Sequence, residues 1–161
     1  MHWRATTAEE TEALGAALAR TLPTTAALVV VYLKGGLGAG KTTLARGFLR
    51  EHGVSGSVRS PTYTLVESYD SGSPIILHLD LYRLRDASEF EPLGLRDWAG
   101  PGYLWLVEWP ERADGMLPPA DLVIELKPGD GNHEITAHAH SDAGKSWLAR
   151  LTEVETPRDP P

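Results

Sequence analysis

The sequence of 161 residues is long enough for one domain with a sizeable buried core and too short for two of ordinary size. Its composition excludes a mostly disordered or fibrous chain, and the net charge of -7 argues against a protein that holds nucleic acid mainly through phosphate contacts. The sequence lacks cysteine, a signal-peptide core and any apolar run close to the ~18 residues of a membrane span, so we expect a cytoplasmic protein without disulfides.

The first half of the chain predicts a helix, a buried strand and a second helix. Thr7 and Glu10 have the spacing of a capping box, and the apolar stripe behind them indicates a helix over residues 8–22. Residues 26–33 form a continuous apolar run rich in valine, which is typical of a strand buried on both faces. After a glycine-rich loop, residues 44–52 predict the second helix.

The second half of the chain predicts shorter strands separated by turns, together with two more helices. Apolar patterns indicate strands over residues 63–69, 75–81, 103–109, 121–126 and 134–140. The last two strands flank a turn that contains Gly129 and Gly131, and they are expected to form a hairpin. Helices are expected over residues 86–94 and 143–151.

Residues 35–42 match the Walker A pattern of a phosphate-binding P-loop, with Gly35, Gly40, Lys41 and Thr42 at the required positions. Glycines let the backbone curl so that successive N–H groups point at phosphate oxygens, and the N-terminus of the following helix adds partial positive charge. Lys41 can reach the β- and γ-phosphates, and the Thr42 hydroxyl can bind Mg²⁺, which prefers oxygen ligands. The composition gives only about 0.005 chance matches, so the pattern indicates a site for ATP and Mg²⁺.

A P-loop between a buried strand and a helix is typical of the P-loop NTPase-like α/β fold. We therefore expect a central mixed, mostly parallel sheet flanked by helices, with antiparallel hairpin additions. Residues 1–154 are expected to form this single domain. Residues 155–161 contain three prolines and are expected to be a flexible C-terminal tail.

Two acids lie at the ends of apolar strands and are candidates for the metal and the attacking water. Asp80 follows the run Ile75 to Leu79, and Glu108 follows the run Tyr103 to Val107. Strands that flank the phosphate strand end at the same edge of the sheet, so both acids can reach the P-loop. We expect Glu108 to be the metal-side acid and Asp80 its partner, whereas the alternative for either is a turn cap or a partner of an arginine.

Residues 60–62, Ser-Pro-Thr, lie between the P-loop helix and the next strand, where nucleotide switches place a hydroxyl that senses the γ-phosphate. Thr62 is therefore a candidate nucleotide contact, and an ordinary proline turn is the alternative. The Asn-Lys-x-Asp segment of guanine-specific proteins is absent, since the only asparagine, Asn132, is followed by His133, so ATP is favoured over GTP. We interpret His138 and His140 as strand surface, because no third metal ligand is suitably spaced.

Two other functions stay open at this point. A small-molecule kinase could use the same P-loop, but it usually needs an arginine-rich lid, and the arginines here are scattered. They are Arg83, Arg85, Arg96 and Arg112. A nucleotide-dependent switch with little hydrolysis is the other alternative, because Asp80 and Glu108 could serve binding alone.

Four blocks of sequence together resemble a known family. They are residues 34–43 (KGGLGAGKTT), 60–66 (SPTYTLV), 78–84 (HLDLYRL) and 107–111 (VEWPE). With these blocks in this order, the chain resembles the bacterial TsaE family, also called YjeE, from about Thr7 to Glu111. The resemblance implies a small P-loop ATPase that works with the TsaB and TsaD proteins to make threonylcarbamoyladenosine beside the anticodon of certain tRNAs.

The resemblance also implies how the work is divided among these proteins. The TsaE member does not transfer the threonylcarbamoyl group; it binds the TsaB–TsaD pair and uses ATP hydrolysis to permit repeated turnover. Its own ATPase activity is expected to be weak without the partners. The acidic balance of this chain fits a protein that docks on another protein, so we expect tRNA to be contacted only indirectly.

The resemblance assigns roles to individual positions. Lys41, Asp80 and Glu108 are expected to act in catalysis, and Thr42, Glu108 and Asp80 to hold Mg²⁺. Nucleotide contacts are expected from Ala8, Gly38, Ala39, Gly40, Lys41, Thr42, Thr43, Trp109 and His133, in addition to Thr62, which its place in the chain suggests. His133 stands where members of the family commonly have an arginine, and its imidazole can stack but is largely uncharged at neutral pH.

Overall fold

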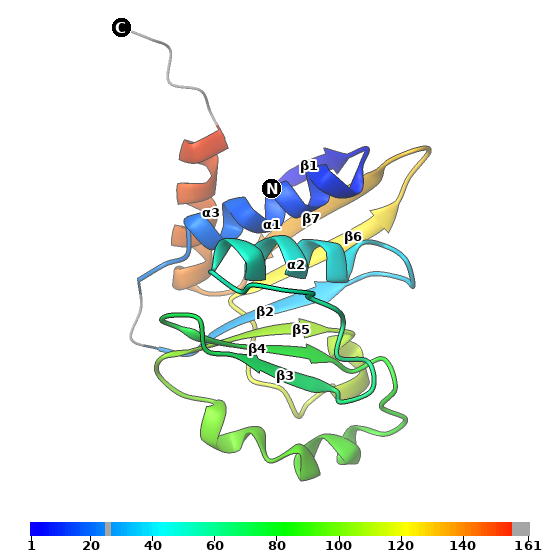
Figure 1. The fold of residues 1–161 in the computed structure, drawn as a ribbon, viewed down its shortest axis with the longest axis vertical. Coiled ribbons are helices and arrows are strands. Elements are labelled where there is room, and N and C mark those ends of the chain that lie inside the picture. Colours follow the sequence, from blue (N-terminus) through cyan, green and yellow to red (C-terminus); the bar gives the residue numbers. More distant parts are fainter. Residues whose placement is uncertain (25–26, 156–161) are drawn as a thin grey trace, which may run out of the picture.

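A seven-stranded sheet runs through the protein, with α-helices on one face and short 3-10 helices on the other (Figure 1). The computed structural model describes residues 1–24 and 27–155. The strands are β1 (His2–Ala5), β2 (Val29–Lys34), β3 (Val66–Tyr69), β4 (Ile75–Asp80), β5 (Tyr103–Glu108), β6 (Leu122–Pro128) and β7 (His133–Ala139). The helices are α1 (Ala8–Arg20), α2 (Lys41–Glu51), η1 (Ala87–Leu93), η2 (Leu95–Trp98), η3 (Pro110–Ala113) and α3 (Asp142–Glu155).

The strand order in the sheet is β1-β7-β6-β2-β5-β4-β3. The four central strands β6, β2, β5 and β4 are parallel to one another, whereas β7 and β1 at one edge and β3 at the other pair antiparallel. This topology confirms the expected α/β class with a mixed sheet and antiparallel hairpin additions. Strand β2, which leads into the glycine-rich loop of residues 35–40, lies between β5 and β6 near the middle of the sheet.

Both faces of β2 are buried, as its unbroken apolar sequence predicts. Val29, Val31 and Leu33 join the core beneath the three α-helices, and Val30 joins a second core beneath the 3-10 helices. The second core is built around Trp105 of β5, whose indole N–H donates to the carbonyl of Trp98 at 2.9 Å. The sheet therefore separates two apolar cores and is shielded on both sides.

Helix α1 begins with the predicted cap in a modified form. The Thr7 hydroxyl accepts a hydrogen bond from the Glu10 amide at 3.2 Å, as a capping residue does. The Glu10 carboxylate reaches one residue further back than expected and accepts from the amide of Thr6 at 2.6 Å. The helix ends at Arg20, two residues before the predicted end.

Helices α1 and α2 pack closely against each other, because a glycine of each helix lies at the contact. A Cβ atom added to Gly47 of α2 would lie 2.0 Å from the carbonyl oxygen of Glu12 in α1. The side chain of Glu12 then accepts from Arg46 at 2.7 Å and from Arg50 at 2.8 Å. The hydrogen bond from Arg46 is the main reason why the pKa of Glu12 is lowered. Arg46 also donates to the carbonyl of Val58, so it joins both helices to the following loop.

Several predicted elements differ from the observed ones. The predicted strand over residues 63–69 begins only at Val66, because Leu65 has a positive φ of 64° that interrupts extended backbone. The helix expected over residues 86–94 is present as a 3-10 helix over residues 87–93, with Pro92 inside it and Gly94 at its end. Strand β1 was not predicted.

The C-terminal part is helical over a longer stretch than the sequence indicates. Helix α3 covers residues 142–155, compared with the predicted 143–151, and packs on α1 through Trp147, whose indole N–H donates to the carbonyl of Leu18 at 2.9 Å. Most of the predicted tail, residues 156–161, lies outside the described residues. Among the described residues, none of the helices has the length and apolar character that a bilayer crossing requires.

The contact at Gly47 can be tested by substitution. Gly47→Ala should lower the free energy of unfolding by about 1–3 kcal/mol, because the added methyl group must push two backbones apart. Urea unfolding followed by circular dichroism measures this difference. Gly100→Ala is the matched control, since a Cβ there meets nothing within 4 Å. A Gly47→Ala protein more stable than the wild type, as at an ordinary helix position, would contradict the packing described.

Candidate functional site

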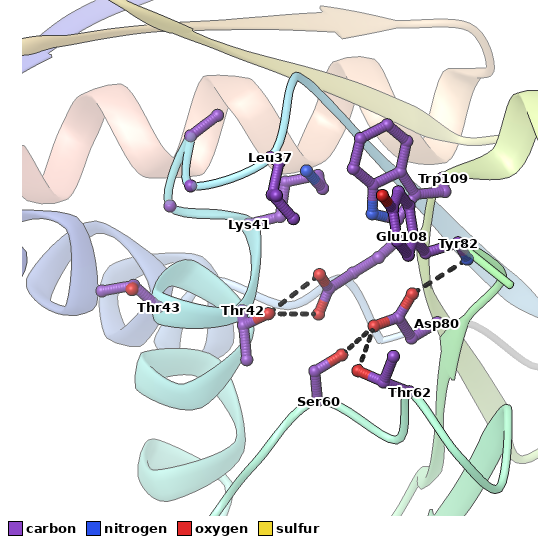
Figure 2. A pocket seen from close by; sticks show the side chains of 13 residues that line it. Leu37, Lys41, Thr42, Thr43, Ser60, Thr62, Asp80, Tyr82, Glu108 and Trp109 are labelled. Atoms are coloured by element: carbon purple, nitrogen blue, oxygen red, sulfur yellow. Dashed lines mark hydrogen bonds between the residues drawn. The ribbon is translucent and has the colours of Figure 1, made fainter.

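A pocket of about 310 Å³ opens at the carboxyl ends of the central parallel strands (Figure 2). It lies between the loop that joins β2 to α2 and the ends of β4 and β5. The residues that line it are Leu37, Gly38, Ala39, Gly40, Lys41, Thr42, Thr43, Ser60, Thr62, Asp80, Tyr82, Glu108 and Trp109. Segments that are far apart in sequence thus meet in the place where α/β sheets bind ligands.

The loop of residues 35–40 delivers the N-terminus of α2 to the pocket. Gly40 has a φ of 97°, a left-handed conformation that a side chain rarely adopts, and α2 begins at the next residue. Gly40 is the N-cap residue of α2 and has no side chain that could accept hydrogen bonds from the first amides of the helix. The first turn of α2 therefore offers backbone N–H groups and partial positive charge to an anion.

Lys41 lies in the wall of this pocket with only 4% of its surface exposed. Its ammonium donates to the carbonyls of Gly35 and Gly36, each at 2.7 Å, and lies 4.0 Å from the centre of the Trp109 ring. Burial lowers the pKa of Lys41, and the carboxylates of Glu108 and Asp80 partly offset that effect. The ammonium is therefore short of water and close to where an anionic ligand would lie.

Trp109 is turned toward Lys41 by an unusual backbone. Its φ of 58° is left-handed, which is strained for a tryptophan and breaks β5 directly after Glu108. The indole packs against the ring of Tyr82, with 4.9 Å between the ring centres. Strain of this kind persists where the surroundings hold it, and here it places an aromatic wall beside the lysine.

Thr42 and Glu108 approach each other closely at the floor of the pocket (Figure 2). The Thr42 hydroxyl is 3.0 Å from one Glu108 carboxylate oxygen and 2.9 Å from the other. Glu108 is only 2% exposed, so its carboxylate is buried within the protein and faces the first turn of α2. The structure thus brings these two predicted site residues into direct contact.

Asp80 lies beside Glu108 because the sheet register pairs the two residues directly across β4 and β5. One Asp80 oxygen accepts hydrogen bonds from the hydroxyls of Ser60 and Thr62, the latter at 3.0 Å. The other oxygen accepts from the amide of Tyr82 at 3.0 Å. Asp80 thus ties the loop that carries Ser60 and Thr62 to the end of β4, as Figure 2 shows.

The residues present fit a magnesium ion. Thr42, Glu108 and Asp80 supply a hydroxyl and two carboxylates, and all three line the same pocket. Mg²⁺ takes oxygen ligands and is usually held by one or two carboxylates together with substrate phosphates. The described residues contain no cluster of three or more histidine, cysteine or acidic side chains that could hold a metal by itself.

Two of the expected nucleotide contacts lie outside the pocket lining. Ala8 is exposed at the start of α1 and is not among the lining residues. The ring of His133 on β7 contacts the loop of residues 35–40, with its Nδ1 atom 2.7 Å from the carbonyl oxygen of Ala39. His138 and His140 are exposed, in agreement with their interpretation as surface residues.

Sequence reasoning missed part of the lining. Leu37 and Tyr82 line the pocket but were not expected to do so. Leu37 is 80% exposed, and the ring of Tyr82 packs against that of Trp109. Ser60 was noted only as part of a motif, although its hydroxyl contacts Asp80 directly. The block HLDLYRL contained a signal for Tyr82, because a residue two places after a strand-end acid lies close to it.

Comparison with known proteins finds a matching family model and similar proteins that carry the same description. A family model described as threonylcarbamoyl adenosine biosynthesis protein TsaE matches residues 5–136. The tRNA threonylcarbamoyladenosine biosynthesis protein TsaE of Haemophilus influenzae is 45% identical over 124 residues, which cover 77% of this chain and 78% of that protein. The protein of the same description from Bacillus subtilis is 38% identical over 140 residues, 84% of each chain. The crystal structure of Bacillus subtilis YdiB superposes with a TM-score of 0.77 at 30% identity, covering 97% of this chain and 96% of that one.

The anchoring of the loop by Asp80 gives a direct test. In Asp80→Asn one acceptor oxygen becomes an NH₂ group, so part of the hydrogen bonding with Ser60, Thr62 and Tyr82 is lost. Amide hydrogen exchange over residues 57–65 should become about tenfold faster, as the loss of about 1.5 kcal/mol implies. Mass spectrometry of the exchanged peptides measures this rate, with Asp70→Asn, at an exposed acid, as the control. Unchanged exchange in Asp80→Asn would show that the carboxylate does not hold the loop.

Proposed function

The chain belongs to the TsaE family, and on that premise we propose that it is an accessory ATPase required to form threonylcarbamoyladenosine in tRNA. The observation that carries this proposal is the meeting of Lys41, Thr42 and Glu108 in one pocket at the N-terminus of α2. A buried ammonium, a hydroxyl and a carboxylate in that arrangement suit a nucleoside triphosphate with Mg²⁺.

The phosphates are proposed to lie against residues 38–43, where the P-loop amides and the first turn of α2 face the pocket. Lys41 would exchange its two carbonyl partners, Gly35 and Gly36, for phosphate oxygens. That exchange is favourable because hydrogen bonds between two charged groups are stronger than those to a neutral carbonyl. Trp109 would remain as an apolar wall beside the lysine.

The Thr42 hydroxyl and the Glu108 carboxylate are proposed to hold Mg²⁺, with Asp80 next to them. The ion supplies charge neutralisation at the phosphates when it is bound. Asp80 is proposed to help orient the attacking water, and Ser60 and Thr62 lie against its carboxylate. Closure of that loop over the γ-phosphate would exclude bulk water from the reacting group.

The nucleoside is proposed to extend toward β7 and the start of α1. Thr11 and His133 both lie next to Gly40, because a Cβ atom added there would be 3.6 Å from the Thr11 methyl and 3.3 Å from the His133 ring. An imidazole in this position can stack on a base or sugar. Ala8 lies one turn before Thr11 and is proposed to contact the same end of the nucleotide.

The proposed partners are the TsaB and TsaD proteins. In this proposal the chain does not transfer the threonylcarbamoyl group, and hydrolysis of ATP resets the partner pair for another turnover. The net charge of -7 supports docking on protein and an indirect relation to tRNA, since tight tRNA binding needs a basic surface.

A nucleotide-dependent switch with little hydrolysis is the second candidate. The observation that favours it is the saturation of Asp80 by Ser60, Thr62 and the Tyr82 amide, because an acid used as a loop anchor need not activate water. The two candidates share the nucleotide site and differ in turnover.

The phosphate site is tested by removal of the lysine. Lys41→Ala should weaken binding of ATP with Mg²⁺ by about 2–5 kcal/mol, because it removes the buried charge that faces the phosphates. Isothermal titration calorimetry measures this loss. Lys145→Ala is the control, since Lys145 pairs with Asp142 on the exposed side of α3. Normal ATP binding by Lys41→Ala would refute the site.

The proposed role is tested by an ATPase assay of the chain with and without a purified TsaB–TsaD pair. We expect a slow rate for the chain alone and a clear increase with the pair, because the partners should complete the site. Glu108→Gln measured in parallel should abolish both rates, which excludes a contaminating ATPase. Nucleotide binding without any stimulated hydrolysis would favour the switch over the ATPase.

A further inference from the structure

A histidine is buried behind the magnesium-side acid and has no part in the function proposed so far. His78 lies on β4 two residues before Asp80, so both side chains project from the same face of the strand. Ile76, two residues before His78, lies on the same face of β4 and belongs to the core beneath the α-helices. His78 and Asp80 therefore also project toward the α-helices. The His78 side chain has 0% of its surface exposed.

The ring of His78 contacts Glu108 directly. Its Nε2 atom lies 2.8 Å from Oε1 of Glu108, and this contact is shut off from water because the Glu108 side chain is only 2% exposed. The proton between them must reside on Nε2, because a carboxylate oxygen is only an acceptor and two acceptors at this distance repel each other.

The other ring nitrogen supports the same assignment. Nδ1 of His78 is buried and has no hydrogen-bond partner among the described residues. Buried N–H donors without a hydrogen-bond partner are rarer in proteins than buried acceptors without one. The unpartnered Nδ1 is therefore assigned as an acceptor that carries a lone pair and no proton. The structure therefore assigns one donor to His78, and this donor is aimed at Glu108.

The hydrogen bond makes the two oxygens of Glu108 unequal. Oε1 has both His78 and Thr42 as partners, whereas the described contact of Oε2 is with Thr42 alone. We propose that His78 is a positioning residue, which holds Oε1 by its Nε2–H and so presents the Glu108 carboxylate to Mg²⁺ in a fixed orientation. This inference rests on the proposed function, because it concerns the same ion.

A fixed carboxylate matters because Mg²⁺ demands near-ideal octahedral geometry and tolerates misplaced ligands poorly. Glu108 reaches the site on a flexible side chain at the end of β5, where Trp109 already leaves the strand. Groups that hydrogen-bond a metal ligand from behind typically contribute about 10- to 100-fold in metal affinity or activity. His78 supplies such a group from the neighbouring strand.

A structural role alone would make a different prediction from the positioning role. A histidine that only fills space in the core could be replaced by leucine with a change in stability and none in magnesium response. His78→Gln keeps an N–H donor at a reach similar to that of Nε2, whereas His78→Leu keeps the apolar volume and removes the donor. The pair therefore separates the hydrogen bond from the packing.

The experiment measures the affinity for a non-hydrolysable ATP analogue by calorimetry, once with Mg²⁺ and once with EDTA. We expect the gain in affinity from Mg²⁺ to fall about tenfold in His78→Leu and to stay near the wild-type value in His78→Gln. The affinity in EDTA should be the same in all three proteins. His138→Leu, which removes an exposed histidine of β7, should leave both affinities unchanged.

An equal Mg²⁺ gain in wild type and His78→Leu would overturn the positioning role while leaving the proposed function intact. Loss of the gain in both His78 variants would also overturn it, because the donor would then not be the relevant feature. A wild-type protein that binds no nucleotide would instead remove the proposed function and this inference together.

A second measurement does not depend on the folding of His78→Leu. Long-range ¹H–¹⁵N spectra of the wild-type protein report which ring nitrogen carries the proton, and the His78 signals are identified by their absence from His78→Gln. We expect the proton on Nε2 and a lone pair on Nδ1. A proton on Nδ1 with a bare Nε2 would overturn the inference, since His78 would then have no donor to offer Glu108.

Discussion

The parallel pairing of β2, β5 and β4 is the constraint on which the rest of the structure depends. Three strands that run in the same direction must end at the same edge, and the register sets Asp80 directly opposite Glu108. The chain that leaves β2 enters the glycine-rich loop of residues 35–40 at that edge and brings Thr42 against Glu108. A shift of one residue in the β4–β5 register would turn one acid to the other face of the sheet and dismantle the pocket.

The edge of the sheet and the two acids on it could be predicted because short, local sequence patterns indicate them. A continuous valine-rich run predicts a central strand, the Walker A spacing predicts the loop after it, and acids that end apolar strands arrive at the same edge by parallel pairing. The register that places Asp80 beside Glu108 is a long-range property of the parallel pair β4 and β5, of which only β5 is a direct neighbour of β2.

The parts that could not be predicted depend on contacts between distant segments. Strand β1 has no periodic pattern of its own and forms by pairing with β7, more than 120 residues later in the chain. The hydrogen bonds of Ser60 and His133 follow from the path of loops, which a sequence pattern does not specify. His78 lies inside an apolar strand, where a histidine gives the same signal whether it fills the core or supports a ligand.

The contacts of Arg46 limit how far the loop that carries Ser60 and Thr62 can move. This arginine holds the carboxylate of Glu12 and the carbonyl of Val58, so the upstream end of the loop is anchored to both α1 and α2. The downstream end is anchored where Val66 pairs with Leu79 of β4. Movement of this loop is therefore confined to the residues between these two anchor points, where Asp80 accepts hydrogen bonds from Ser60 and Thr62.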